Sequence, residues 1–142
     1  MIRKCTACGT ENRVPPKHLA DRGRCGACKH ALDPLADPVD VDGDASFDAI
    51  TREARVPVLV DFWATWCGPC RQTAPEVQKA ARELAGKALV LKVDTDRHPE
   101  LAARFHVRGI PNFVVLREGR IVGQQTGAIG HRELTALVNG PG

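Results

Sequence analysis

The pentapeptide Trp66-Cys67-Gly68-Pro69-Cys70 constrains this chain of 142 residues more than any other stretch. Its two cysteines are three residues apart, so on a helical turn their side chains lie on one face. They follow an apolar run, Val58 to Ala64, that is typical of a buried strand, and a helical pattern comes after them. Cys67 is therefore expected where a strand gives way to a helix. Unpaired N–H groups and the helix dipole stabilise an anion there, in this case a thiolate.

The surrounding sequence decides between interpretations of this pair. Taken alone, Cys-x-x-Cys could be half of a zinc site or a fortuitous pair. Here Asp61-Phe62-Trp63-Ala64 precedes it and Arg108-Gly109-Ile110-Pro111 lies far downstream, and the three stretches together resemble the motifs of the thioredoxin family. The resemblance covers roughly residues 39–142. It implies an α/β thioredoxin fold, in which a mixed central sheet has helices on both faces.

The first 38 residues contain a separate cysteine pattern. Cys5 and Cys8 form one Cys-x-x-Cys pair, Cys25 and Cys28 form another, and sixteen residues separate the two pairs. This spacing is typical of a zinc ribbon, in which four thiolates complete a closed tetrahedral site. The segment has few large apolar residues, so metal binding would supply folding energy that its core lacks. We predict a zinc-ribbon-like module with a structural Zn²⁺ in residues 1–38, and a redox domain in residues 39–142.

Two alternatives to zinc stay open for these cysteines: extra redox pairs or disulfides, and iron in a four-thiolate site. The segment has seven Lys and Arg against four Asp and Glu, but this basic excess does not by itself indicate nucleic-acid binding. A Zn²⁺ with four thiolates carries about −2, which the basic residues offset. The segment also has no aromatic residue to stack on a base. We therefore expect no nucleic-acid partner.

Three Cys-x-x-Cys pairs in this order cover essentially the whole chain, and they are similar to the pattern of the zinc-containing thioredoxin-2 type of bacterial thioredoxin. This resemblance implies a protein-disulfide reductase that carries out thiol–disulfide exchange through Cys67 and Cys70. It further implies disulfide-containing protein substrates and an NADPH-dependent thioredoxin reductase as partners, with no organic cofactor in this chain.

Apolar periodicity and turn residues predict the elements of the redox domain. Two prolines predict that residues 33–38 form an extended, stiff linker ahead of it. Asp44 or Ser46 would cap the first helix, and Glu118-Gly119 would form the turn of a hairpin. We expect strands at 39–41, 57–63, 88–94, 112–116 and 120–125, and helices ending near 54 and spanning 71–85, 99–105 and 131–138. Strands that alternate with helices and end in a hairpin indicate a mixed sheet.

The resemblance assigns catalytic roles to four residues. Cys67 would attack the substrate disulfide as the more exposed thiolate, and Cys70 would then resolve the mixed disulfide. Asp61 would be a buried carboxylate, with a raised pKa, that takes the proton of Cys70. Lys92 would be its charged partner. The alternatives are a structural aspartate satisfied by the backbone and an edge-facing lysine.

The resemblance also predicts a docking surface for the substrate. Pro111 matches the cis-proline that the family packs opposite the cysteines. The backbone of Ile110 would pair with an extended substrate segment. Asn112 replaces the threonine that is more usual there, which leaves the substrate preference open. The expected substrate-binding residues are Trp66, Gly68, Pro69, Gly109, Ile110, Pro111 and Gly127.

Composition and patterning limit the remaining possibilities. No run of about 18 apolar residues exists, so we expect no membrane spans. No apolar segment follows the first charged residues, so we expect no secretory signal and a cytoplasmic protein. We also expect a monomer. Two other functions stay open. The zinc module would make the chain a redox sensor or redox-regulated holdase if oxidation of its thiolates released the metal. The other is a nucleic-acid or protein adaptor that merely keeps the fold, and the intact cysteine pair and Asp61 argue against it.

Overall fold

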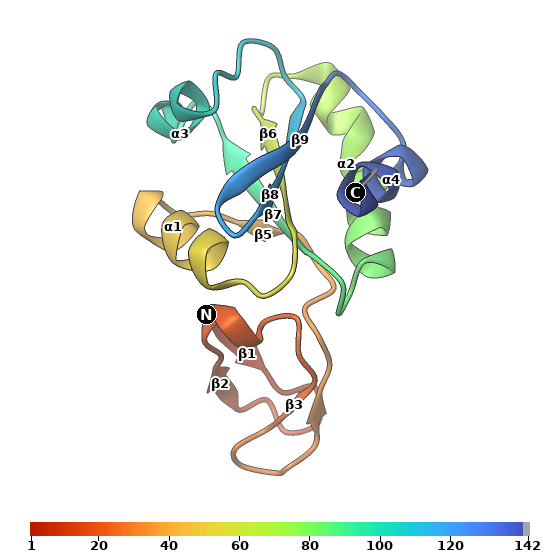
Figure 1. Ribbon diagram of the computed structural model, residues 1–142. Helices are drawn as coiled ribbons and strands as arrows, with labels where there is room; N and C mark the ends of the chain where they lie inside the picture. Colours follow the sequence, from red (N-terminus) through yellow and green to blue (C-terminus); the bar gives the residue numbers. More distant parts are fainter. Residues whose placement is uncertain (141–142) are drawn as a thin grey trace.

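A five-stranded mixed sheet organises the chain from Val39 onward in the computed structural model, which describes residues 1–140 (Figure 1). Its strands are β5 (Val39–Asp40), β6 (Val58–Trp63), β7 (Leu89–Asp94), β8 (Asn112–Arg117) and β9 (Arg120–Thr126). They are arranged in the order β5-β7-β6-β8-β9. The first three in the chain pair in parallel, β8 is antiparallel to β6, and β9 is antiparallel to β8. The predicted fold class is confirmed.

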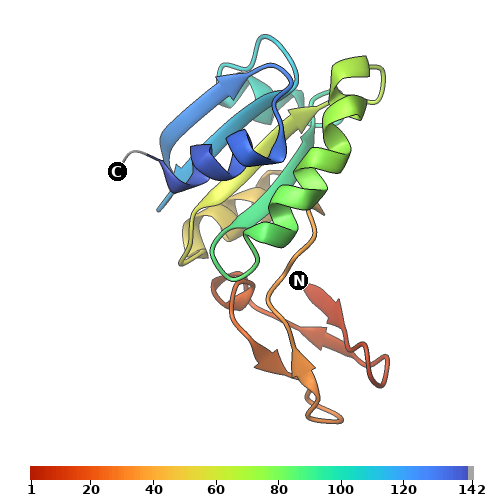
Figure 2. The same cartoon turned by 90° about the vertical axis from the view of Figure 1, so that its right-hand side faces the viewer.

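Helices cover both faces of the sheet (Figures 1 and 2). They are α1 (Asp44–Glu53), α2 (Gly68–Glu83), α3 (Pro99–Arg104) and α4 (His131–Asn139). The apolar residues of α1 and α3 share one core cluster with the sheet, centred on Phe47, Phe62 and Leu101. Those of α2 and α4 form a second cluster with Val77, Phe113 and Leu134. No helix within residues 1–140 is both long enough and apolar enough to cross a bilayer.

Two predicted helix starts are wrong. The residue before α1 is Gly43, and neither Asp44 nor Ser46 caps the helix, because the Ser46 hydroxyl donates to Oδ1 of Asp42 instead. α2 begins at Gly68 rather than residue 71. Pro69 fits its first turn, where a missing N–H leaves no hydrogen bond unmade.

Residues 1–32 form two small antiparallel hairpins below the main sheet (Figure 2). The first pairs β1 (Ile2–Lys4) with β2 (Glu11–Arg13), and the second pairs β3 (Gly23–Arg24) with β4 (Ala31–Leu32). A 3₁₀ turn, η1 (Pro16–His18), lies between them. Each cysteine pair lies in the turn of one hairpin. Gly9 follows the first pair at a positive φ of 76°, and Lys29 takes the equivalent conformation after the second pair, at 66°.

The predicted linker docks on the main core. Residues 33–38 contain no helix or strand, as expected. However, the side chain of Leu35 is buried, and its N–H donates to the carbonyl of Leu19 at 2.9 Å. Both leucines belong to the cluster of Phe47 and Phe62. Burying a leucine contributes about 1.5–3 kcal/mol, so the hairpin module is held against the sheet by apolar contact as well as by the chain.

Glu76 on α2 holds the start of α4, and this contact can be tested. Its Oε1 accepts the N–H of His131 at 3.3 Å, and that hydrogen bond is the main cause of the lowered pKa of Glu76. We expect Glu76→Ala to lower the free energy of unfolding at neutral pH, because the N–H of His131 loses its acceptor at the start of α4. A carboxyl with a lowered folded pKa stabilises above its unfolded pKa, about 4.3, so the difference should shrink as pH falls below that value.

Urea unfolding at neutral and acid pH measures this difference. Glu76→Gln is the matched control, because it keeps an acceptor oxygen and should lose less stability than Glu76→Ala. Equal stability of Glu76→Ala and the wild type at neutral pH would show that the contact contributes nothing.

Candidate active site

The Cys67–Cys70 pair lies where β6 gives way to α2, as predicted, and a disulfide bond joins the two residues. Cys67 is the N-cap of α2, and its Sγ accepts the N–H of Cys70 at 3.1 Å. The carbonyl of Cys67 accepts the N–H of Arg71 at 3.2 Å. The sulfur thus lies at the start of the helix and accepts one N–H of its first turn, and this environment favours a thiolate when the bond is reduced.

The expectation that Cys67 is the more exposed cysteine is wrong for the disulfide form. Cys67 is 3% exposed and Cys70 is 5% exposed. Ala64 and the partly buried Trp63 and Ile110 pack around the pair. The cause is tertiary packing, which the spacing of the two cysteines does not reveal.

The segment before β8 faces the disulfide. The Ile110–Pro111 peptide bond is cis, and the carbonyl oxygen of Ile110 is 3.8 Å from Sγ of Cys67. The carbonyl of Pro111 accepts the N–H of Gly127 at 2.8 Å. An added Cβ on Gly109 would lie 3.4 Å from a methyl group of Thr126. The predicted residues from three separate parts of the chain thus meet beside Cys67.

Trp66 forms the other side of this surface. Its side chain is largely exposed, and its Nε1 donates to Oδ2 of Asp96 at 2.9 Å. Asp96 was not predicted from the sequence, because nothing local marks an aspartate in the loop after β7 as a partner for an indole. A hollow of about 140 Å³ lies here, lined by Trp66, Thr95, Ala102, Val107, Arg108 and Ile110.

Asp61 is buried on the α2 side of the sheet. Side chains alternate along β6, and Leu59, two residues earlier, belongs to the α2–α4 cluster. Asp61 is 2% exposed, and its Oδ1 has no hydrogen-bond partner among residues 1–140. Burial raises the pKa of Asp61 to about 7, the charge of Lys92 opposes this rise, and Asp40 adds to it. A carboxyl of this kind exchanges a proton near neutral pH.

Lys92 pairs directly with Asp61 in the register of β6 and β7. Its Nζ lies 4.5 Å from the centre of the Trp63 ring, a cation–π distance. The ion pairs within residues 1–140 do not include one between Lys92 and Asp61. Since β7 lies between β5 and β6, Lys92 is not on an edge strand.

The four N-terminal cysteines converge. The Sγ atoms of Cys5 and Cys28 are 3.6 Å apart, as are those of Cys8 and Cys25, and all four sulfurs lie within 4.8 Å of one another. Tetrahedral Zn–S bonds of about 2.3 Å require sulfurs about 3.8 Å apart, so the set fits a zinc ion.

Backbone donors support this cluster. The N–H of Cys28, with the amide of Asn12 and the N–H of Ala27, lowers the pKa of Cys25 to about 6. N–H donors to a ligand sulfur are typical of the outer shell of a metal site. His18 pairs with Asp21 at 2.7 Å and is not part of the cluster.

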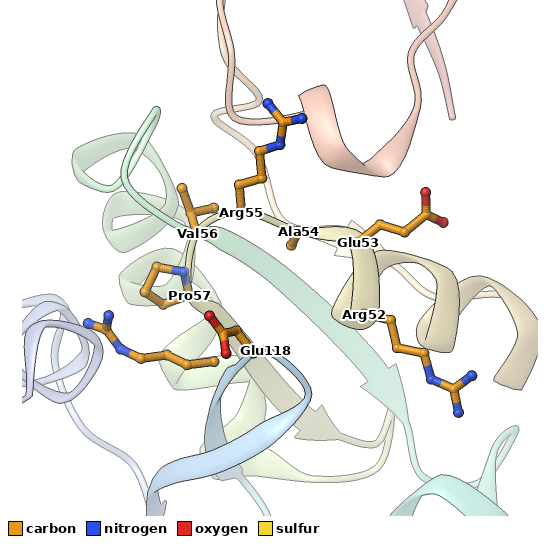
Figure 3. A pocket seen from close by; sticks show the side chains of 8 residues that line it. Arg52, Glu53, Ala54, Arg55, Val56, Pro57 and Glu118 are labelled. Atoms are coloured by element: carbon orange, nitrogen blue, oxygen red, sulfur yellow. The ribbon is translucent and has the colours of Figure 1, made fainter.

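A second hollow, of about 460 Å³, lies at the opposite end of β6 from Cys67 (Figure 3). It is lined by the last two residues of α1, by the residues between α1 and β6, and by Arg117 and Glu118. Arg52 and Arg55 point in opposite directions, so their charges do not converge on a ligand. The cysteines therefore remain the candidate chemical centres.

Known proteins share this architecture. Residues 38–140 match the family model described as Thioredoxin. Thioredoxin C-3 of Corynebacterium nephridii is 38% identical over 134 residues, covering 94% of this chain and 90% of that protein. Because this match leaves out so little of the chain, it extends into the four-cysteine segment. Thioredoxin 1 of Nostoc sp. is 43% identical over 86 residues, covering 61% of this chain and 80% of that protein.

A solved structure agrees with these matches. A mutant thioredoxin from Halobacterium salinarum NRC-1 superposes with a TM-score of 0.68 at 33% identity, covering 74% of this chain and 90% of that one. The family model, the relatives and the disulfide at the start of α2 agree. The chain belongs to the thioredoxin family, and it is a protein-disulfide reductase.

Proposed function

We propose that this chain reduces protein disulfides with Cys67 as nucleophile and Cys70 as resolving thiol, and that the N-terminal cysteines hold a structural Zn²⁺. The observation that carries the assignment of roles is the N–H of Cys70 that donates to Sγ of Cys67. Only the sulfur at the N-cap receives this donor and the positive end of the helix dipole. Cys67 is therefore the thiolate of the reduced pair.

The reaction has two steps. The Cys67 thiolate attacks one sulfur of the substrate disulfide, which forms a mixed disulfide and releases the other substrate sulfur as a thiolate. Cys70, once deprotonated, attacks Sγ of Cys67, forms the Cys67–Cys70 bond and releases the second substrate thiolate. The substrate gains two electrons and the enzyme pair loses two. The resolving step needs two close sulfurs, and the Cα atoms are 5.2 Å apart.

Asp61 takes the proton of Cys70 in the second step. The support is its burial on the side of the sheet that α2 covers, together with a pKa of about 7. Lys92, held over Trp63, limits the rise of that pKa. Both residues thus set when the resolving thiol loses its proton.

The substrate docks against Trp66 and the segment 109–111. The carbonyl of Ile110 faces Cys67, so an extended substrate strand that pairs with this backbone would bring its disulfide to the sulfur. Gly68 and Pro69 in the first turn of α2, and Gly127 behind Pro111, complete this surface.

The partners follow from the chemistry. The oxidised pair needs two electrons to react again, and an NADPH-dependent thioredoxin reductase supplies them. The catalytic and docking residues come from one chain, so a monomer suffices. A cytoplasmic location provides the reducing conditions in which such a dithiol turns over.

The metal module, residues 1–38, contributes stability. Its own apolar cluster contains only Cys5, Cys25 and Leu32, so a bound Zn²⁺ would supply much of its folding energy. Its cysteines lie in hairpin turns beyond the end of the sheet that is far from Cys67 (Figures 1 and 2). A strand of six residues is about 20 Å long, so these thiolates act apart from the redox pair.

A zinc-linked redox sensor or holdase is the second candidate. One observation favours it: Leu19 and Leu35 are buried in the shared core, so unfolding of the module would expose them and the face they cover. The test is zinc release under mild peroxide together with new binding of an unfolded client. Full oxidation of Cys67 and Cys70 with zinc retained would rule this function out.

Substitution of each redox cysteine tests the assigned roles. Cys67→Ser should abolish insulin reduction, because no other sulfur is at the N-cap of α2. Cys70→Ser should still attack but not resolve, so a stable mixed disulfide with the substrate should accumulate, visible by mass spectrometry. Wild-type activity in Cys67→Ser, or trapping by Cys67→Ser rather than by Cys70→Ser, would contradict the roles.

Asp61→Asn tests the buried carboxyl. A raised folded pKa stabilises fully below the unfolded pKa, about 4, and that contribution is lost as pH rises through about 7. The oxidised Asp61→Asn protein should therefore be more stable than the wild type above neutral pH, by roughly 2 to 4 kcal/mol, and about equally stable at pH 4. Release of substrate from the mixed disulfide should slow at least about tenfold.

Denaturant unfolding against pH and single-turnover kinetics measure these effects. Asp40→Asn is the comparison variant: Asp40 is exposed on β5 and only adds to the rise of the Asp61 pKa, so its loss should keep the pH-dependent transition and move it slightly to lower pH, whereas Asp61→Asn removes the transition. Parallel stability curves for Asp61→Asn and the wild type would show that Asp61 has an ordinary pKa.

Metal analysis and chelation test the zinc site. We expect one zinc ion per chain, lost when Cys25 is replaced by Ser and retained in His18→Ala. Removal of zinc should lower stability and increase binding of a hydrophobic dye as Leu19 and Leu35 become exposed. Insulin reduction should persist, because the cluster lies far from Cys67. Loss of reductase activity on chelation alone would contradict a purely structural metal.

A further inference from the structure

Asn112 is a buried polar residue that the exchange chemistry does not use. It is the first residue of β8, directly after Pro111, and is 3% exposed. Its Nδ2 donates to Oγ1 of Thr126 at 3.1 Å, and its Oδ1 accepts from Nε2 of Gln124 at 3.2 Å. A buried amide is costly unless both of its ends are paired. Both ends are paired here, each by a side chain of the neighbouring strand β9.

Gln124 connects this pair of strands to a third segment. The same Nε2 donates to the carbonyl oxygen of Phe105 at 3.3 Å. Phe105 ends α3, and Asn112 begins β8. One amide group therefore contacts both ends of the segment between them, residues 106–111, which carries the docking residues Gly109, Ile110 and Pro111.

Thr126 braces the middle of the same segment. A Cβ added to Gly109 would lie 3.4 Å from a methyl group of Thr126, so Thr126 limits the space beside Gly109. The N–H of the next residue, Gly127, donates to the carbonyl of Pro111 at 2.8 Å. β9 pairs with β8 along this length (Figure 1). Contacts from β9 thus reach the start, the middle and the end of the docking segment.

We propose that Asn112, Gln124 and Thr126 are positioning residues that hold the segment 106–111 in the geometry that receives a protein substrate. None of these hydrogen bonds involves a redox cysteine, so they act through the docking backbone and not on the sulfur. The proposal rests on the proposed function, which makes the Ile110 backbone the docking strand.

Asparagine suits this role better than a threonine would. Its amide presents a donor and an acceptor on separate atoms, which reach Thr126 and Gln124 in different directions. A threonine offers one oxygen, one bond nearer to the backbone. The geometry of the docking segment therefore depends on a network that the residue at 112 completes.

Two substrates of different size distinguish an effect on docking from an effect on the exchange chemistry. Each protein is assayed with insulin, which needs the docking segment, in excess dithiothreitol that recycles the pair. It is also pre-reduced, freed of dithiothreitol and assayed with dithiobis-nitrobenzoate, which is small enough to reach Sγ without the docking segment. Asn112→Thr and Gln124→Ala should lower kcat/KM for insulin about three- to tenfold, mainly through KM, as expected for loss of one or two hydrogen bonds. The rate with the small disulfide and the reduction potential should not change.

Gln125→Ala is the matched control, because Gln125 is the adjacent residue of the same strand and its side chain makes no hydrogen bond within residues 1–140. It should behave as the wild type with both substrates. The double variant Asn112→Thr/Gln124→Ala should be no worse than the more affected single variant, since both remove one network.

Each outcome of these assays either supports or overturns the proposal. An unchanged kcat/KM for insulin in Gln124→Ala, or an equal fall with both substrates, would overturn the proposal. Gln124 is exposed on an edge strand, so its variant should fold even if Asn112→Thr does not, and it then decides alone. A wild-type protein that reduces neither substrate would instead contradict the proposed function.

Discussion

The hydrogen bond from the N–H of Cys70 to Sγ of Cys67 is the interaction on which this structure most depends. A helix start needs an acceptor for its unpaired N–H groups, and a side-chain oxygen usually supplies it. Here a sulfur does so. Pro69 has no N–H, so in this first turn the Cys70 donor is aimed at the sulfur without a competitor from position 69. The contact that caps α2 is thus the same contact that stabilises a thiolate, so the start of the helix also prepares the nucleophile.

The central position of β6 in the sheet places Asp61 in an apolar environment. Alternation along β6 places Val60 and Phe62 in one core and Leu59 in the other, so the face that holds Asp61 is apolar. The burial that makes β6 a stable central strand is therefore what raises the pKa of Asp61. Lys92, one strand away, moderates that rise without a direct ion pair. Stability given up at one carboxyl is a common feature of catalytic sites, where local rules of packing are broken for a chemical purpose.

Local patterns in the sequence predict the central elements well. Continuous apolar runs predict β6 and β7, and a two-residue turn with positive φ at Glu118 and Gly119 closes the hairpin as expected. The failures involve contacts between distant residues. The burial of Cys67 by Ile110 and the docking of Leu35 depend on how separate segments pack, and no periodicity encodes that. The bonds of Gln124 belong to the same class, because an isolated glutamine on an exposed strand carries no signal of its partners.

One apolar core connects the N-terminal hairpins with the segment beside the redox pair. Leu19 and Leu35, Phe47 and Phe105 are members of one apolar cluster, and Ile110, beside Cys67, packs against it. The rings of Phe47 and Phe105 are 5.6 Å apart, in an edge-to-face arrangement. A continuous path of van der Waals contact therefore runs from the metal module to the docking segment. Such a path transmits rigidity, but a switch also needs an element with two discrete arrangements, and close-packed side chains of this kind do not provide one. The N-terminal hairpins and the docking segment are thus joined through one close-packed core.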